Sequence, residues 1–362
     1  MTATPVRALF VLPSFAGGGA ERVALNIVGR LRAGDVTPHL LVLEGSGPLA
    51  ALVPADVPCT VLGVPRLRHA LRRIIGEIRR LRPDVVFSTL GYINLALLAL
   101  RPLLPRGTRI VVREANLPSL SLAATSRPGL LRAAYRWFYR QADTVVATSE
   151  RMADELCRDF RVPAVRIVIV PNPVDEDAIR SAAAAVQRRA GDGLRLVAAG
   201  RLTRQKGFDR LIELLPSLDR AVSVAILGDG EDGAALGQQA ERLGVADRLV
   251  FLGFMDNPWA WYAGADAFVM PSRWEGMPNA ALEALACGTP VIATPEAGGI
   301  AEVADRAPAG AVTVAAMGEP FLAALRGLEP RAKPGGPRTS LLPPEYRADT
   351  VSAALSDILR SA

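Results

Sequence analysis

The sequence has few of the residues that build disulfide frameworks, metal sites and histidine-based catalytic centres. Its three cysteines, Cys59, Cys157 and Cys287, are odd in number and far apart along 362 residues. That pattern argues against a disulfide framework or a metal site and is typical of a reducing compartment, so we expect a cytoplasmic protein. The two histidines, His39 and His69, lie in no motif, and we assign neither a catalytic role.

Long apolar runs are also missing. No run approaches the roughly 20 apolar residues that a membrane-spanning helix requires, and the nearest, 90–104, is interrupted by Arg101 and Pro102. The range 1–6 lacks a basic region followed by an apolar one, so we expect no signal peptide.

Lysine is almost absent, because only Lys206 and Lys333 are lysines among 42 basic residues. Residues 1–180 carry 24 arginines against 15 acidic residues, whereas the remainder carries 18 basic and 21 acidic residues. A basic first half suits an anionic membrane surface or an anionic acceptor; a compositional preference for arginine is the alternative. Nucleic acid is not an expected partner, since no basic stretch with interleaved aromatic residues occurs.

The range 66–82 is predicted to form a basic amphipathic helix. One stripe is apolar, and the other face carries seven arginines: Arg66, Arg68, Arg72, Arg73, Arg79, Arg80 and Arg82. Such a helix can lie on a membrane, which would make this a peripheral contact at the inner face of the plasma membrane. Alternatively, the apolar stripe packs on the protein's own sheet while the arginines face water.

The order of elements predicts an α/β fold with two doubly wound, Rossmann-like domains that face one another across a cleft. Apolar strands alternate with helices on both sides of a stretch poor in large apolar residues. We therefore predict a first domain over 1–177, a linker over 178–193 and a second domain over 194–343. A final helix within 344–362 would pack back on the first domain.

The run 267–294 carries the strongest functional signal. A buried strand over 267–270 leads through a loop to a helix over 278–287, which ends at Gly288, and a second strand follows over 290–294. Glu275 and Glu283 stand eight positions apart on either side of the helix N-terminus, whose free N–H groups suit a phosphate. Amides for phosphate and carboxylates for hydroxyl groups fit a nucleotide sugar; two solvated glutamates are the alternative.

The string EGMPNAALEALACGTPVIAT resembles the E-x7-E region of retaining, nucleotide-sugar-dependent glycosyltransferases of family 4, also described as glycosyl transferases group 1, which have the GT-B fold. The resemblance implies that Glu275 contacts the donor sugar and Glu283 the ribose hydroxyls. It also implies that the intervening residues face the sugar and diphosphate: Gly276, Met277, Pro278 and Asn279.

Further motifs of the second half resemble the same family. GRLTRQKGFDRLIE, which begins at Gly200, resembles its donor-phosphate loop, so Arg201 and Lys206 are the candidates for stabilising the diphosphate; alone, they would be solvated cations. Gly228 begins a glycine turn beside the nucleotide, and Phe254 and Met255 are candidate base contacts. Packing is expected of Trp259, Trp261 and Tyr262.

In the first half, SFAGGGAERV resembles the family's glycine loop, where Gly18 and Gly19 would border the diphosphate and Arg22 the acceptor. Arg113 ends the strand 109–113, and Glu114 and Asn116 follow it; all three lie at its carboxyl end, where a cleft belongs, and are acceptor-side candidates. A turn-forming role for Asn116 is equally open. The segment NPVD at 172–175 resembles the end of the family's first domain.

The resemblance implies transfer of a sugar from a nucleoside diphosphate, with UDP favoured, to an acceptor hydroxyl on a lipid-linked or cell-envelope glycan. No metal or other cofactor is expected if Arg201 and Lys206 neutralise the leaving diphosphate. Asp175-Glu176-Asp177 matches the D-x-D metal signature of another transferase fold, and we interpret it as a chance match. The alternatives are a nucleotide-sugar epimerase, a phosphorylase-like enzyme, and a non-catalytic membrane-associated binding subunit.

Overall fold

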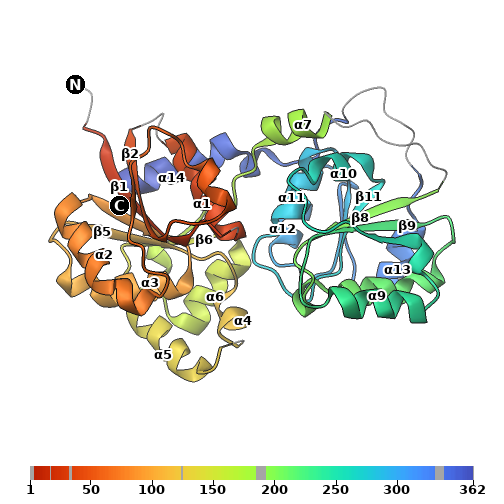
Figure 1. Ribbon diagram of the computed structural model, residues 1–362, viewed down its shortest axis with the longest axis horizontal. Helices are drawn as coiled ribbons and strands as arrows, with labels where there is room; N and C mark the ends of the chain where they lie inside the picture. Colours follow the sequence, from red (N-terminus) through yellow and green to blue (C-terminus); the bar gives the residue numbers. More distant parts are fainter. Residues whose placement is uncertain are drawn as a thin grey trace. The chain divides into compact units, whose positions relative to one another are not determined.

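The computed structural model describes residues 4–16, 18–31, 35–123, 125–184, 193–330 and 338–361. The chain forms two compact units, one of Met1–Pro173 with Ala348–Ala362 and one of Val174–Arg347 (Figure 1). The first unit thus ends four residues before the predicted boundary at 177. The predicted linker begins inside helix α7 (Glu176–Ala184) of the second unit, and its residues 185–192, like Gly17 of the glycine loop, lie outside the described residues.

Within the described residues, the first unit is built on a seven-stranded parallel sheet of order β3-β2-β1-β4-β5-β6-β7. Its central strands are apolar runs buried on both faces, the pattern expected of a parallel sheet covered by helices on both sides, whereas the edge strands β3 and β7 are largely exposed. They are β1 (Val6–Ser14), β2 (Val36–Glu44), β3 (Cys59–Val61), β4 (Val85–Ser88), β5 (Arg109–Arg113), β6 (Thr144–Ala147) and β7 (Ile167–Ile169).

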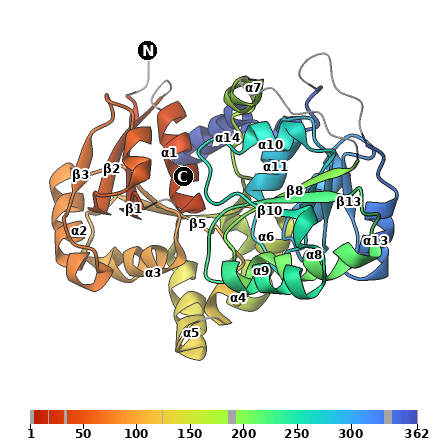
Figure 2. The same cartoon turned by 45° about the vertical axis from the view of Figure 1, so that its right-hand side comes forward.

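Helices α1 (Gly19–Leu31) and α14 (Ala348–Ser361) cover one face of this sheet (Figures 1 and 2). Val28 of α1 and Val351 and Leu355 of α14 are buried against the strands with Phe10 of β1. An ion pair between Arg30 and Asp349, 2.5 Å long, joins the two helices. The final helix therefore completes the core of the first unit.

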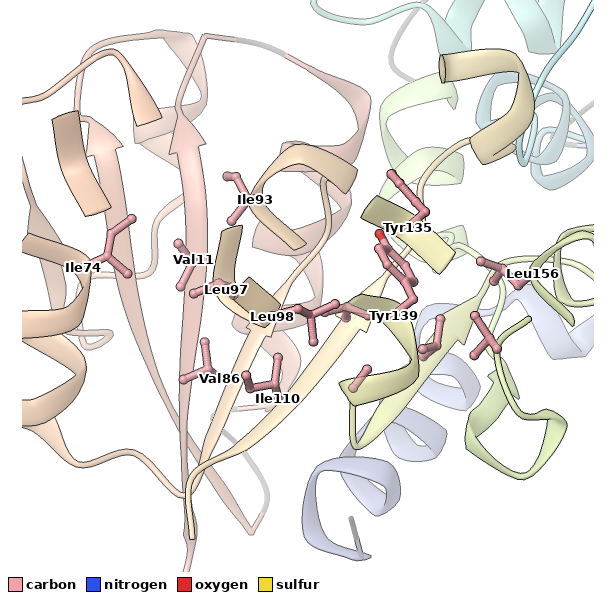
Figure 3. Packing of buried hydrophobic residues seen from close by; sticks show 14 of the residues in the cluster. Val11, Ile74, Val86, Ile93, Leu97, Leu98, Ile110, Tyr135, Tyr139 and Leu156 are labelled. Atoms are coloured by element: carbon pink, nitrogen blue, oxygen red, sulfur yellow. The ribbon is translucent and has the colours of Figure 1, made fainter. Parts of the chain in front are cut away.

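The opposite face is covered by α2 (Leu67–Leu81), α3 (Gly91–Leu100), α4 (Pro118–Ala123), α5 (Pro128–Phe138) and α6 (Glu150–Phe160). Figure 3 shows Ile74 of α2, Leu97 of α3 and Tyr139, just after α5, directed at the strands. The stripe of α2 thus packs on its own sheet, whereas its arginines are exposed. No helix among the described residues is long and apolar enough to cross a membrane.

The second unit repeats the architecture around a six-stranded parallel sheet, counted over the described residues, of order β10-β9-β8-β11-β12-β13. Its strands are β8 (Arg195–Ala199), β9 (Ser223–Leu227), β10 (Leu249–Phe251), β11 (Ala267–Met270), β12 (Val291–Ala293) and β13 (Val312–Val314). One face packs on α8 (Phe208–Leu214), α9 (Gly233–Arg242) and α13 (Glu319–Arg326). The other packs on α7, α10 (Trp259–Gly264), α11 (Asn279–Ala286) and α12 (Ile300–Arg306).

The chain enters and leaves the second unit through two paired segments. The backbone N–H of Val174 donates to the carbonyl of Tyr346 at 2.9 Å, and Glu176 forms a 2.8 Å ion pair with Arg347. The predicted doubly wound α/β architecture is confirmed in each unit. The helix predicted over 278–287 spans Asn279–Ala286, so Pro278 is its N-cap and not its first helical residue.

Candidate functional site

Two loops of the second unit meet at the carboxyl edge of its sheet. Strands β8 and β11 are hydrogen-bonded neighbours, and the strand order reverses direction between them. Ligands of doubly wound sheets bind at such a switch point, outside the carboxyl ends of the strands. The loop after β8 (200–207) and the loop after β11 (271–278) therefore begin side by side.

Lys206 and Glu275 join these two loops. The Nζ atom of Lys206 lies 2.6 Å from Oε1 of Glu275, whose side chain is 8% exposed against 21% for the lysine. The same carboxylate accepts hydrogen bonds from Ser272 Oγ at 3.0 Å and from Gln205 Nε2 at 3.4 Å. A nearly buried carboxylate is thus satisfied by three donors while the ammonium keeps access to solvent.

Gly207 allows the two loops to approach this closely. Its φ is +68°, and a Cβ atom there would lie 2.2 Å from the carbonyl oxygen of Pro271. Any side chain would push the loops apart and combine that clash with a left-handed backbone. The Lys206–Glu275 pair depends on this contact because each partner lies within four residues of it.

Helix α11 carries the second predicted carboxylate, Glu283, on the same side as Asn279, one turn earlier. Both are partly exposed, and Oε2 of Glu283 accepts a 3.0 Å hydrogen bond from the indole Nε1 of Trp259. We expected Trp259 only to pack; it packs at the edge of the core cluster and also orients this carboxylate.

The remaining predicted donor residues lie at the same edge of the second sheet. The Gly200 N–H donates to the Leu227 carbonyl at 2.9 Å, and the Gly228 N–H donates to the Gly253 carbonyl at 2.7 Å. These hydrogen bonds connect the turns after β8, β9 and β10. Phe254 directly follows and is 66% exposed. Met255 is half-buried against the core.

Arg201 lies exposed in the loop after β8. Within the part of the chain that the structure describes, its side chain makes no hydrogen bond or ion pair, in contrast to Lys206.

The Gly276 carbonyl accepts a 2.9 Å hydrogen bond from the Gly299 N–H, which brings the glycine turn after β12 to the Glu275 loop. Met277 is 6% exposed and serves the core.

In the first unit, Arg113 and Glu114 are buried. Arg113 is 2% exposed, and its guanidinium donates to Thr89 Oγ1 at 2.9 Å and to Asn172 Oδ1. Burial lowers the pKa of Arg113 to about 10, against the opposing influence of Glu114. The arginine thus ties the end of β5 to the segment that leaves this unit.

Glu114 lies in a polar cluster under α3 and α5. Its carboxylate, 4% exposed, accepts from the Tyr139 hydroxyl and from Asn94 Nδ2 at 3.0 Å, and Ser88 donates to Asn94 Oδ1 at 2.5 Å. Burial raises the pKa of Glu114 to about 7 although these donors and Arg113 oppose the rise. The Tyr139 ring stacks on the Tyr135 ring with 4.3 Å between their centroids; both residues are labelled in Figure 3.

The other first-unit candidates lie nearer to solvent. Asn116 is exposed and Arg22 half-buried, while Gly18 and Gly19 lie at the start of α1. The Glu21 carboxylate folds back over Gly18, where an added Cβ would lie 1.9 Å from Glu21 Oε2. A carboxylate of the chain itself thus lies at the helix N-terminus, the place predicted for a phosphate.

The D-x-D triplet belongs to the start of α7. Asp175 accepts from the Ala178 N–H at 3.2 Å, a capping bond, and Glu176 pairs with Arg347. Within the described ranges, no group of three or more His, Cys, Asp or Glu residues could hold a metal ion.

Sequence reasoning overlooked several residues that hold the predicted ones. They include Gln205 and Ser272 around Glu275, and Asn94, Tyr139 and Asn172 in the first unit. Asn94 could have been found from the sequence, because it is the single amide side chain in the apolar helix 91–100. A polar residue in such a run must find buried partners.

Two family models match the chain, and together they cover both units. The model described as Glycosyltransferase Family 4 matches residues 17–178, and the model described as Glycosyl transferases group 1 matches residues 180–326.

Curated relatives agree with these models. Over 250 residues the chain is 32% identical to glycogen synthase of Mycobacterium tuberculosis, a match covering 67% of this chain and 59% of that protein. Over 302 residues it is 26% identical to N-acetylgalactosamine-N,N'-diacetylbacillosaminyl-diphospho-undecaprenol 4-alpha-N-acetylgalactosaminyltransferase of Campylobacter jejuni, covering 80% and 81%. The chain spans about three fifths of the length of the first curated relatives that it matches.

Among solved structures, HepE from Anabaena in complex with UDP superposes with a TM-score of 0.76. The match covers 99% of this chain and 100% of HepE at 19% identity, so it bears on the fold.

Proposed function

Because this chain belongs to glycosyltransferase family 4 and has the GT-B fold, we propose that it is a retaining, hexosyl-type glycosyltransferase that uses a nucleoside diphosphate sugar. The observation that carries the proposal is the Lys206–Glu275 pair beside the N-terminus of α11. A cation, the N–H groups of a helix N-terminus and oriented carboxylates are the groups that a diphosphate and sugar hydroxyls require.

In the proposed reaction, the acceptor hydroxyl oxygen bonds to the anomeric carbon as the bond between that carbon and the diphosphate breaks, and the hydroxyl proton passes to a donor phosphate oxygen. Negative charge develops on the diphosphate oxygen as it leaves. Lys206, held by Glu275, and the exposed Arg201 would stabilise that charge, and Glu283 would accept hydrogen bonds from the ribose hydroxyls. These cations take the place of a metal ion in the proposal, so activity is expected to persist in EDTA.

UDP is the favoured nucleotide because HepE, a structural neighbour, was solved with UDP. A lipid-linked or cell-envelope glycan is the favoured acceptor for two reasons. The relative from C. jejuni is named for a diphospho-undecaprenol substrate, and the first unit carries 24 basic residues against 14 acidic ones. An anionic diphosphate on the acceptor would be attracted by that charge.

The test is thermal unfolding of the wild type with a panel of UDP-, GDP- and ADP-sugars, beside Lys206→Ala and Glu283→Ala. A nucleotide that binds only the native state raises the melting temperature, and both variants should weaken the shift. Arg242→Ala, an exposed cation of α9 away from the site, is the matched control and should keep it. No shift with any nucleotide would overturn the proposed donor site.

Turnover is measured with the nucleotide that binds. Lys206→Ala should lower kcat about 100- to 1,000-fold, as loss of one transition-state charge partner does in other enzymes. Formation of a free epimer or a sugar phosphate in place of a glycoside would contradict the proposed reaction.

A further inference from the structure

Arg273 forms a further connection between the two loops of the candidate site. Its guanidinium makes a bidentate ion pair with Asp209, in which the Nη1–Oδ1 and Nη2–Oδ2 distances are 2.7 and 2.6 Å. Asp209 lies in the first turn of α8, directly after the loop that contains Lys206, whereas Arg273 lies two residues before Glu275. The ion pair therefore connects the chain segments next to the Lys206–Glu275 pair.

Backbone groups reinforce this connection. The N–H of Arg273 donates to the Gln205 carbonyl at 2.8 Å, and its Nη1 donates to the Arg204 carbonyl at 3.0 Å. In the other direction, Gln205 Nε2 donates to the Trp274 carbonyl at 3.0 Å. Gln205 and Trp274 each directly precede a member of the charged pair described above, so these bonds hold the backbone immediately beside it.

The Arg273–Asp209 ion pair is only partly shielded from water. The side chains of Arg273 and Asp209 are 25% and 38% exposed. The hydrogen bond from Arg273 lowers the pKa of the Asp209 carboxyl, and the same bond raises the pKa of the guanidinium, so both groups stay charged near neutral pH. Partly exposed ion pairs contribute little to the free energy of unfolding, so this one matters chiefly for the positions of the loops.

We propose that Arg273 is a positioning residue for glycosyl transfer, which holds Lys206 and Glu275 in place for the diphosphate and the donor sugar. A bidentate guanidinium–carboxylate pair suits this role because it fixes orientation as well as distance. Arg273 acts through the two loops and needs no contact with substrate. The inference rests on the proposed function and deepens it.

The experiment compares kcat and KM for the preferred nucleotide sugar in wild type and Arg273→Ala. We expect kcat to fall about 10- to 100-fold, because a displacement of about 1 Å at a reacting centre can cost that much. KM should rise less than about five-fold, because the contacts predicted for Phe254 and Glu283 are unchanged.

Arg101→Ala in the first unit is the matched control. Arg101 also forms a bidentate ion pair, with Asp143 at 2.7 and 2.8 Å, and it also donates to a backbone carbonyl, that of Gln141. The side chains of Arg101 and Asp143 are 34% and 27% exposed, close to the values for Arg273 and Asp209. The control removes an equivalent interaction away from the site and should keep the wild-type kcat.

Three further measurements distinguish positioning from folding. Arg273→Lys keeps the charge but loses the bidentate fork, so its kcat should be intermediate. Millimolar ethylguanidinium, which replaces the deleted head group, should raise kcat of Arg273→Ala and leave wild type unchanged. Asp209→Asn should also lower kcat, and combining it with Arg273→Ala should lower kcat no further than Arg273→Ala alone, because the two residues act as one unit.

Thermal unfolding with the nucleotide separates a failure of this inference from a failure of the proposed donor site. Arg273→Ala should keep a nucleotide-induced melting shift, because Lys206 is still present. A wild-type kcat in Arg273→Ala, an equal loss in Arg101→Ala, or complete loss of the melting shift in Arg273→Ala alone would overturn the positioning role. Absence of a shift in wild type with every nucleotide would overturn the donor site, and this inference with it.

Discussion

In the first unit, the charged residues at the carboxyl end of β5 are sealed inside the fold, whereas in the second unit the cations that follow β8 keep access to solvent. Arg113 and Glu114 are 2% and 4% exposed, and their partners come from surrounding elements of the same unit. Lys206 is 21% exposed on its side chain, and Arg201 lies in the open. The same sheet architecture thus places charge at the same edge for two purposes.

The difference teaches that the carboxyl end of a strand is a place for polar residues and does not by itself make them ligands. The neighbours decide. Asn94 and Tyr139 close over Glu114, so its hydrogen bonds are made within the protein. Around Lys206 the glycines at 200 and 207 have no side chains that could close over the ammonium.

The largest expected effect is on the buried arginine. Arg113→Ala should lower the free energy of unfolding by about 3 kcal/mol or more, since it empties a buried volume and leaves Thr89 and Asn172 without their donor. Arg201→Ala in the second unit should change it by less than about 0.5 kcal/mol. Denaturant titration followed by circular dichroism measures the free energy of unfolding of both variants. Equal losses of unfolding free energy in the two variants would contradict the contrast between the units.

The second prediction concerns pH. Burial gives Glu114 a folded-state pKa of about 7, above the ordinary value of 4.5 for a glutamate, so the folded state binds this proton more tightly than the unfolded state does. Its contribution to stability is therefore present at low pH and is lost as pH rises from about 4.5 to 7, by up to about 3 kcal/mol. Glu114→Gln should remove that fall in unfolding free energy. Parallel pH curves for variant and wild type would contradict the prediction.

The smallest expected effect is on nucleotide affinity at the solvent-accessible site of the second unit. Trp259→Phe keeps an aromatic ring but removes the N–H donor that holds Glu283, so the Kd for the preferred nucleotide should rise about ten-fold. Titration calorimetry with the nucleotide and its 2′-deoxy analogue measures this, and the preference for the ribose hydroxyl should shrink in the variant. Trp261→Phe on the same helix is the control. An unchanged ribose preference would deny Trp259 a positioning role.

The sequence predicted the sheets well because parallel strands are short apolar runs. Strands β5 and β11 have the predicted bounds, and helix α11 is one residue shorter than predicted at each end. The helices were harder to place. Helix α3 lies within the run 90–104, which the sequence marks only as the nearest approach to a membrane span. Helix α5 was not predicted, since its inward and outward faces both carry large apolar residues.

The motif predicted which residues of the site matter, but not what each one contacts. Lys206 and Glu275 are 69 positions apart, and only the adjacency of β8 and β11 brings them to 2.6 Å. Burial of Arg113 and Glu114 was equally invisible, because their partners come from α3, from the segment after α5 and from residue 172. Local sequence patterns do not encode such long-range contacts.

Helix α14 has a consequence for the order in which the protein is made. Its Val351, Leu355 and Leu359 fill one side of the core of the first unit, but they leave the ribosome after the whole second unit. At about 5–20 residues per second, the strands and α1 wait roughly ten to thirty seconds for that helix. During synthesis the second unit can finish folding before the first, and the nascent first unit holds an uncovered apolar face that chaperones can bind.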